Sequence, residues 1–373
     1  MPKAEPRIAL VCDFLTTMGG AEKVVLALHE IFPNAPIYTA LYNPEKLPEF
    51  DGADVRTSYL QKLPKFLRKT HRMFPTLGVK AFRDFDLSRY DIILTSSYLN
   101  ANQVRKTRPD QVLISYCHTP ARYYWSHYDL YRKEPGFGAL NPLVRFLMPL
   151  MVPHQRKLDY AAAQHVDVWI ANSTEAQERI KKYYGKSSTV VHPPVDVQRF
   201  SPARERGDYY VTLGRQLPNK RFDLAVAACT QLGVPLKVFG NGEMHDELVK
   251  IAGPTIQFYT DRFGDASDAA VEEALNHAKG FVFPSDEDFG IVSVEALAAG
   301  APVIGYARAG TRDIVTDGDT GVLFEHQTVE ELVKAIKRAE NIRWFPSKLN
   351  RTARRFDKSL FTTKIRKIIL DQC

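Results

Sequence analysis

The alternation of short apolar runs with helical patterns is the feature of this chain that most limits its fold. In the first half, five such runs are typical of strands, and Gly20–Phe32 between the first two is typical of an amphipathic helix. Strands that alternate with helices of this length predict a parallel sheet covered on both faces. The predicted strands are Ile8–Val11, Ile37–Ala40, Asp91–Ser96, Val112–Cys117 and Val166–Ala171.

The same rhythm restarts in the second half. Between the halves, Val191–Pro202 contains three prolines and predicts a turn-rich connector. We therefore expect two domains, 1–199 and 200–373, and a chain of 373 residues is long enough for two cores. The second half is predicted to hold strands Tyr209–Leu213, Leu236–Phe239, Gly280–Phe283 and Pro302–Gly305, and helices Phe222–Leu232, Ile291–Ala299 and Phe361–Leu370.

Composition and charge narrow the class of protein. The 45% hydrophobic and 25% charged content is ordinary for a globular protein, and no apolar run reaches the 18 residues of a membrane span. The beginning of the chain lacks the apolar core of a signal peptide, so we expect a cytoplasmic protein. Four scattered cysteines argue against a zinc site. The net charge of +7 favours anionic partners, but no nucleic-acid motif accompanies it.

The stretch 284–300, P-S-D-E-D-F-G-I-V-S-V-E-A-L-A-A-G, carries the most specific chemistry. It predicts a loop, a helix start and a helix that ends at Gly300, with Glu287 before the helix and Glu295 within it. The free N–H groups of a helix N-terminus suit a phosphate, and carboxylates accept hydrogen bonds from pairs of hydroxyls. A nucleotide-sugar, with a diphosphate between two polyols, meets both demands.

This stretch resembles the E-x7-E signature of the family-four retaining glycosyltransferases. The resemblance implies an α/β GT-B fold, with two Rossmann-like domains, a donor-binding cleft between them, and a last helix (about 358–371) that crosses back to the first domain. In that family the first Glu and the backbone after it hold the donor sugar, and the second Glu holds the ribose diol. Carried over, these residues are Glu287, Phe289, Gly290, Ile291 and Glu295.

Two cations follow the first predicted strand of the second half, in G-R-Q-L-P-N-K. Arg215 and Lys220 bracket a short loop before a helix, which suits a diphosphate. The segment resembles the family's G-R-x(4)-K, so we expect both cations to stabilise the departing nucleoside diphosphate. They would take the place of a metal ion, and no other cofactor is expected.

Three further loops resemble donor-side segments of the family. Gly19 and Gly20 follow the first strand and let backbone N–H groups approach a phosphate, although a simple tight turn is nearly as good an interpretation. Gly240, in G-N-G-E, lies beside the nucleotide in the family, and a packing turn is an equal alternative. Arg262 and Phe263 occupy the place where the family contacts the base.

His118 follows another predicted strand, in S-Y-C-H-T-P-A-R-Y-Y-W. A lone His is usually structural, but the aromatic residues around it suit sugars. The segment resembles the C-H-T-P-x-R-Y-x-W run of bacterial O-antigen and capsule mannosyltransferases, where a His reaches the donor sugar. We therefore predict His118 as a site residue and GDP-mannose as the donor.

Two segments raise the question of a membrane. Residues 60–83 mix aromatic and aliphatic residues with Lys and Arg, which fits a segment on an anionic membrane surface or, equally, a solvated helix with a core face. On the first interpretation the protein is peripheral on the inner face of the membrane. Leu140–Val152 is apolar but too short to span, and we expect it to pack on the protein.

Together with these patterns, the family resemblance implies a metal-independent retaining glycosyltransferase of surface polysaccharide or lipopolysaccharide biosynthesis. It would transfer a hexose, mannose first, to a hydroxyl of a glycan or lipid-linked oligosaccharide. Glu287 would orient the sugar rather than attack it, because the two glutamates are too far apart along the chain for a hydrolase pair. The alternatives are an enzyme of the same fold that uses a UDP-sugar and a non-catalytic module that binds glycans or nucleotide-sugars.

Overall fold

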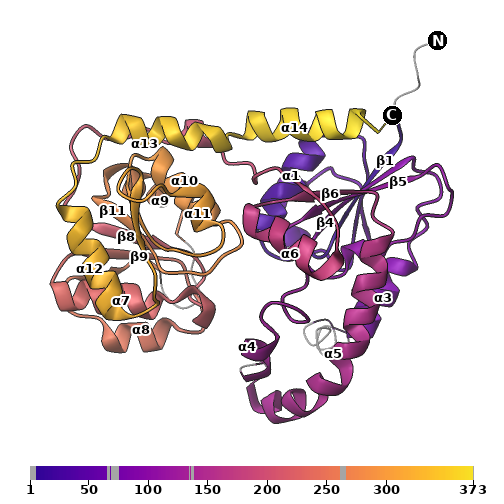
Figure 1. The fold of residues 1–373 in the computed structure, drawn as a ribbon, viewed down its shortest axis with the longest axis horizontal. Helices are drawn as coiled ribbons and strands as arrows, with labels where there is room; N and C mark the ends of the chain where they lie inside the picture. The colour runs from indigo at the N-terminus through magenta and orange to yellow at the C-terminus, as the bar shows by residue number, and fades with distance from the viewer. Residues whose placement is uncertain are drawn as a thin grey trace. The chain divides into compact units, whose positions relative to one another are not determined.

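The chain forms two compact α/β units (Figure 1). The computed structural model describes residues 6–64, 68, 75–133, 135, 138–260 and 266–372. The first unit comprises Met1–His192 and Thr362–Cys373, and the second comprises Pro193–Phe361. The division after His192 lies seven residues before the end of the expected first domain at 199.

The first unit is built on a seven-stranded parallel sheet in the order β3-β2-β1-β4-β5-β6-β7. Leu10 of β1 pairs with Ile37 of β2 on one side and with Leu94 of β4 on the other, so β1 and β4 lie at the centre. The strands are β1 Ile8–Cys12, β2 Ile37–Thr39, β3 Val55–Thr57, β4 Ile92–Ser97, β5 Val112–Cys117, β6 Val168–Ala171 and β7 Thr189–Val190. The described helices are α1 Gly20–Ile31, α3 Pro75–Arg83, α4 Tyr128–Lys133, α5 Asn141–Gln164 and α6 Thr174–Tyr184.

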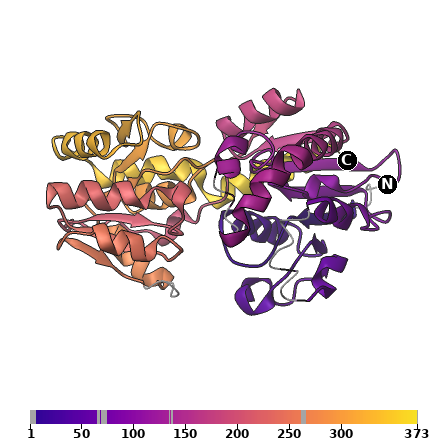
Figure 2. The same ribbon diagram turned by 90° about the horizontal axis from the view of Figure 1, so that it is seen from below.

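The second unit has a six-stranded parallel sheet in the order β10-β9-β8-β11-β12-β13, seen from below in Figure 2. Its strands are β8 Tyr210–Leu213, β9 Leu236–Phe239, β10 Ile256–Phe258, β11 Gly280–Phe283, β12 Val303–Tyr306 and β13 Gly321–Phe324. Its helices are α7 Phe222–Leu232, α8 His245–Ile251, α9 Asp268–His277, α10 Ile291–Ala298, α11 Thr311–Ile314, α12 Val329–Glu340 and α13 Pro346–Ala353, and α14 Lys358–Leu370 runs from this unit into the first.

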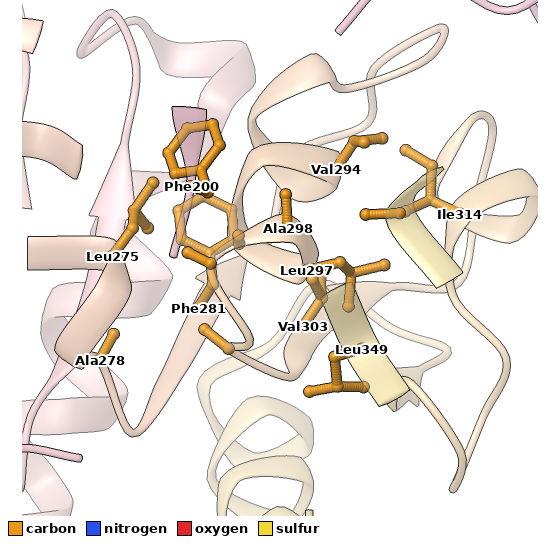
Figure 3. Close-up of a cluster of buried hydrophobic side chains, with 14 of the residues drawn as sticks. Phe200, Leu275, Ala278, Phe281, Val294, Leu297, Ala298, Val303, Ile314 and Leu349 are labelled. Carbon is orange, nitrogen blue, oxygen red and sulfur yellow. The ribbon is translucent and has the colours of Figure 1, made fainter. Parts of the chain in front are cut away.

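Helix α10 is embedded in the core of the second unit. Leu297 is fully buried among Phe281 of β11, Val303 of β12 and Leu349 of α13 (Figure 3). The helix carries no charge except Glu295. Its other residues are almost all apolar or small, as expected for a helix that is surrounded by other elements rather than exposed on one side. This packing fixes the position of the loop that leads into it.

Both sheets reverse their strand order at one point. In the first unit the reversal lies between β1 and β4, and in the second between β8 and β11. Ligands of open α/β sheets bind outside the carboxyl ends of the strands at such a point. The loops after β8 and β11 carry Arg215, Lys220 and Glu287, so the topology brings the predicted diphosphate and sugar segments to one place.

Helix α5 departs from the expectation for its apolar segment. It runs for 24 residues with Pro149 and Pro153 inside it, and part of its apolar surface is exposed rather than packed on the protein. Within the residues that the structure describes, no helix combines the length and the apolar character needed to cross a membrane.

Candidate functional site

Lys220 and Glu287 form an ion pair at the strand-order reversal of the second unit. Lys220 ends a 3₁₀ turn, Pro218–Lys220, and Glu287 lies in the loop between β11 and α10. Their side chains are 18% and 24% exposed, so both are screened from solvent but remain accessible. Ser285 donates a hydrogen bond from its Oγ to the Lys220 carbonyl oxygen at 2.8 Å, which ties the two loops through the main chain as well.

The backbone after Glu287 is held by the loop that precedes α11. The Gly310 N–H donates to the Glu287 carbonyl oxygen at 3.0 Å. A Cβ at Gly310 would lie 2.2 Å from the Cα of Phe289, a distance that no side chain tolerates. Phe289 is buried with its ring centroid 5.5 Å from that of Phe356, and Gly290 starts α10 with a φ of +91°. The path of the backbone from Glu287 to Gly290 is therefore fixed on both sides.

Replacing Gly310 by alanine is expected to destabilise the second unit by about 1–3 kcal/mol, the usual cost of overpacking. The loop that carries Glu287 must shift to admit the new methyl group. The free energy of unfolding from urea titrations would measure this loss, and Arg308→Ala, at an exposed position in the same loop, provides the control. A Gly310→Ala protein as stable as wild type would contradict this account of the loop.

Gln216 joins the loop after β8 to the loop after β9. Its Nε2 donates to the Gly240 carbonyl oxygen at 2.6 Å, and its Oε1 lies 3.0 Å from Nδ1 of His245. A Cβ at Gly240 would lie 2.0 Å from the Gly214 carbonyl oxygen, so the two loops touch backbone to backbone. Gly240 thus takes part in a packing contact, while Arg215 follows Gly214 with its side chain exposed.

Glu295 and the start of α10 complete the predicted donor segment. Glu295 is buried in the helix, and Ile291 at the first helical position is half-buried. Ser293 lies between them with a buried Oγ that has no hydrogen-bond partner among the described residues. Arg262 and Phe263 lie outside the described residues, and their predicted contact with the base stays a prediction.

In the first unit, His118 directly follows β5. Its Nε2 lies 2.8 Å from Ser96 Oγ, and its ring contacts those of Tyr98 and Tyr116 at centroid distances of 6.2 and 5.3 Å. The side chain is buried, with a small exposed part. Gly19 caps α1 and Gly20 is the first residue of that helix, so the free N–H groups of the helix start at the Gly-Gly pair.

Asp13 organises the same sheet edge and was not singled out from the sequence. Its carboxylate accepts four backbone N–H groups, from Tyr98 at 2.7 Å, Leu99 at 3.0 Å, Asn100 at 2.5 Å and Ala101 at 2.9 Å. Burial raises the pKa of Asp13, and the four donors oppose that shift. The residue holds the loop after β4 in position beside His118.

A second buried carboxylate supports the aromatic loop. Asp159 Oδ2 accepts from Trp125 Nε1 at 2.6 Å and from the Tyr184 hydroxyl at 2.7 Å. Burial raises the pKa of Asp159 to about 6, although both donors favour the ionised form.

Asp159→Asn is expected to gain stability relative to wild type as the pH rises. Because the pKa of Asp159 is higher in the folded state than its ordinary value of 3.8, the neutral acid stabilises the fold fully at low pH, and this contribution is lost as the pH rises through about 6. The asparagine has no such loss, so the difference in unfolding free energy should change by up to about 3 kcal/mol between pH 4 and pH 7. Urea titrations across this range would measure it; a difference independent of pH would contradict the assignment.

No group of three or more His, Cys, Asp or Glu side chains that could hold a metal ion occurs among the described residues. The structure brings Lys220 and Glu287 into contact, and Gly310 and Gln216 are the supporting residues that the sequence did not reveal as such.

Two family models match the chain in succession. Residues 18–199 match Glycosyltransferase Family 4, and residues 194–356 match Glycosyl transferases group 1. The chain belongs to the family-four glycosyltransferases. The two parallel sheets are those of the GT-B fold, as predicted.

Relatives within the family differ in the donors that their names state. A GDP-mannose-dependent alpha-(1-6)-phosphatidylinositol monomannoside mannosyltransferase of Mycolicibacterium smegmatis is 28% identical over 50% of this chain and 56% of its own. A sulfoquinovosyl transferase of Arabidopsis thaliana is 25% identical over 95% of this chain and 67% of its own. The chain spans about half the length of the first curated relatives it matches.

The fold of this family-four chain also matches solved structures. The Anabaena HepE structure in complex with UDP-glucose superposes with a TM-score of 0.70 at 16% identity, and covers 98% of this chain and 99% of its own. At that identity the likeness concerns the fold alone.

Proposed function

We propose that this family-four protein is a retaining glycosyltransferase that moves a hexose from a nucleotide diphosphate to a hydroxyl of a glycan acceptor. The observation that carries the proposal is the contact of Lys220 with Glu287 at the strand-order reversal. It joins a cation suited to a diphosphate to a carboxylate suited to sugar hydroxyls, as one nucleotide-sugar requires.

Each charged residue is proposed to bind a different part of the donor. Arg215 and Lys220 would bind the diphosphate and stabilise its negative charge as it leaves. Glu287 would orient the sugar and stabilise positive charge at its ring, and Glu295 would accept hydrogen bonds from the ribose diol. The backbone of Phe289, Gly290 and Ile291 would line the sugar, in keeping with the fixed loop path.

The proposal also includes residues that the family resemblance implies. His118, Gly19 and Gly20 would contact the donor, and Gly240 would support the nucleotide side through the backbone contact with Gly214. In the transfer, the bond from the anomeric carbon to the diphosphate oxygen breaks and a bond to the acceptor oxygen forms on the same face. The departing phosphate oxygen takes the acceptor's proton, so no protein base is needed.

Mannose from GDP-mannose is the donor that we favour. The mannosyltransferase-like segment around His118 supports it, as does the GDP-mannose-dependent relative. A UDP-sugar is the alternative, since the solved structure of similar fold holds UDP-glucose. We further propose a lipid-linked oligosaccharide of surface polysaccharide synthesis as the acceptor, and a protein peripheral to the membrane that presents it. A non-catalytic module that binds glycans remains the alternative from another class.

Titration calorimetry with GDP, UDP and ADP, followed by mass spectrometry of sugar released from the matching donors, tests the proposal. Binding of GDP with turnover of GDP-mannose is the expected result. A preference for UDP would keep the site and overturn the donor. Failure to bind any nucleotide would overturn the transferase function.

A further inference from the structure

The first unit contains a pocket that the donor site does not use. It encloses about 1000 Å³ of empty space, a volume that includes space open to solvent. Its walls come from α3, α4 and α5 and from the loops after β1, β2 and β4. Representative lining residues are Phe14, Leu99, Tyr131, Leu147, Met148 and Met151.

The lining suits a hydrocarbon rather than a sugar. None of the described lining residues is charged, and most are aliphatic or aromatic. Covering such an apolar surface with a hydrocarbon removes it from water, which is favourable, whereas a sugar needs several polar partners. Besides the tyrosines, the polar side chains of the described lining are the amides of Asn100 and Gln155. The buried Oε1 of Gln155 has no hydrogen-bond partner among the described residues, so it could accept from a ligand hydroxyl.

The pocket lies at the functional edge of the sheet. Phe14 follows β1, Ala40 follows β2, and Leu99 follows β4, all at the carboxyl ends of the strands. Leu99 is the neighbour of Tyr98, whose ring contacts His118, and Asp13 holds the backbone of both Tyr98 and Leu99. Leu99 therefore connects the pocket wall to the loop that Asp13 holds beside His118.

The outer surface of α5 extends the apolar character beyond the pocket. Leu143, Phe146 and Leu150 lie one turn or two apart on one face, and the last two are 70% and 68% exposed. Exposed cations stand on the same helix and on α4, whose end is bound to α5 by hydrogen bonds from Arg145 to the Lys133 carbonyl oxygen. The exposed cations are Arg132, Lys133, Arg145 and Lys157. Apolar and cationic side chains together complement a lipid with an anionic head group.

We propose that this pocket binds the hydrocarbon chain of a phosphate-bearing lipid that carries the acceptor. The proposal rests on the proposed function for the role of that lipid as acceptor. The chain would fill the space among α3, α4 and α5, the phosphate would lie near the exposed cations, and the sugar would reach the sheet edge at His118.

Dodecyl phosphate below its micellar concentration is the probe, measured by titration calorimetry on the whole chain. We expect saturable binding with a negative heat-capacity change, which marks apolar burial. Met151→Glu places a charge in the pocket and should weaken binding at least about tenfold, because an unpaired carboxylate is costly in apolar surroundings. Val249→Glu, which adds the same carboxylate at an apolar position of the second unit that is 48% exposed, should leave the affinity within about twofold.

Nucleotide binding, measured on the same samples, separates the two proposals. Wild type that binds GDP or UDP but not dodecyl phosphate overturns the lipid site and leaves the proposed function standing. Wild type that binds dodecyl phosphate through Met151 but no nucleotide keeps the lipid site and overturns the transferase. Equal loss in both variants would also overturn the pocket as the binding site.

A measurement on wild type covers the case in which Met151→Glu does not fold. An alkyl phosphate with a photoreactive diazirine at the chain end should label the inner face of α5, between Val144 and Gln155. Labelling confined to other segments would contradict the proposal.

Discussion

Turnover of Glu287→Ala is expected to fall by about 10²–10³-fold, while its affinity for the free nucleotide stays close to that of wild type. Glu287 is proposed to act on the sugar, which the free nucleotide lacks, so its loss should appear in kcat rather than in nucleotide binding. Steady-state kinetics with the donor identified by calorimetry would measure the first quantity, and titration with GDP or UDP the second.

Glu287→Gln is the matched control, because it keeps a hydrogen-bond acceptor and removes the charge. If Glu287 only orients the sugar, the glutamine should recover much of the lost rate. If it also stabilises positive charge at the sugar ring, the glutamine should stay nearly as slow as the alanine. Full activity of Glu287→Ala would remove this residue from the site, and a folded variant that keeps glycan affinity without any wild-type turnover would favour the binding module.

Lys220→Met should lower turnover by a similar factor, about 10²–10³-fold, and should also weaken nucleotide binding. Lys220 is proposed to bind the diphosphate in the ground state and more strongly as charge develops on leaving. Its removal also leaves Glu287, 24% exposed, without its ionic partner and close to an anionic ligand. The same kinetic and calorimetric measurements would show both effects.

Lys334→Met, on the exposed side of α12, is the control for loss of one positive charge and should behave as wild type. The double variant Lys220→Met, Glu287→Ala should lose less than the product of the single effects, because the two side chains contact each other. Multiplicative losses would mean that the ion pair has no part in the mechanism.

Much of the architecture could be predicted because it depends on local patterns. Strands β5, β9 and β11 and helix α7 have the predicted bounds, since apolar runs between turn residues and a capping glycine define them. The edge strands β3, β7 and β10 are two or three residues long and have too little pattern to detect. They form because a neighbouring strand offers hydrogen bonds. Their position therefore depends on the whole sheet and not on their own residues.

In helix α5 the sequence contains a clear local signal, but the structure does not follow it. Proline inside a helix removes a backbone hydrogen bond and usually kinks or ends the helix, yet α5 continues through both Pro149 and Pro153. Its neighbours α4 and α3 are in contact with it, as the hydrogen bond from Gln155 Nε2 to Thr76 Oγ1 at 3.1 Å illustrates. Packing against neighbouring helices thus outweighs the preference of proline against the interior of a helix.

Charged residues and glycines mark the candidate site in the sequence, whereas the residues that support its loops do not stand out there. Lys220 and Glu287 come from separate segments, and the parallel topology explains their meeting. Gln216 and Asp13 act by binding backbone groups of other loops, and nothing in their neighbours along the chain indicates these partners. Such residues become visible only when the loops are placed in space.

The first unit is built from two segments that are far apart in the sequence, and this affects the order in which the units can fold during synthesis. Its sheet is complete at β7, but Thr362–Cys373, with the buried Ile365 and Ile369 of α14, belongs to it as well. A ribosome therefore produces the entire second unit before it supplies the segment that closes the first. Domains that are continuous in sequence fold in turn as they emerge. Here the first unit to begin folding is the last to finish, and until then the apolar surface that receives α14 is open to chaperones.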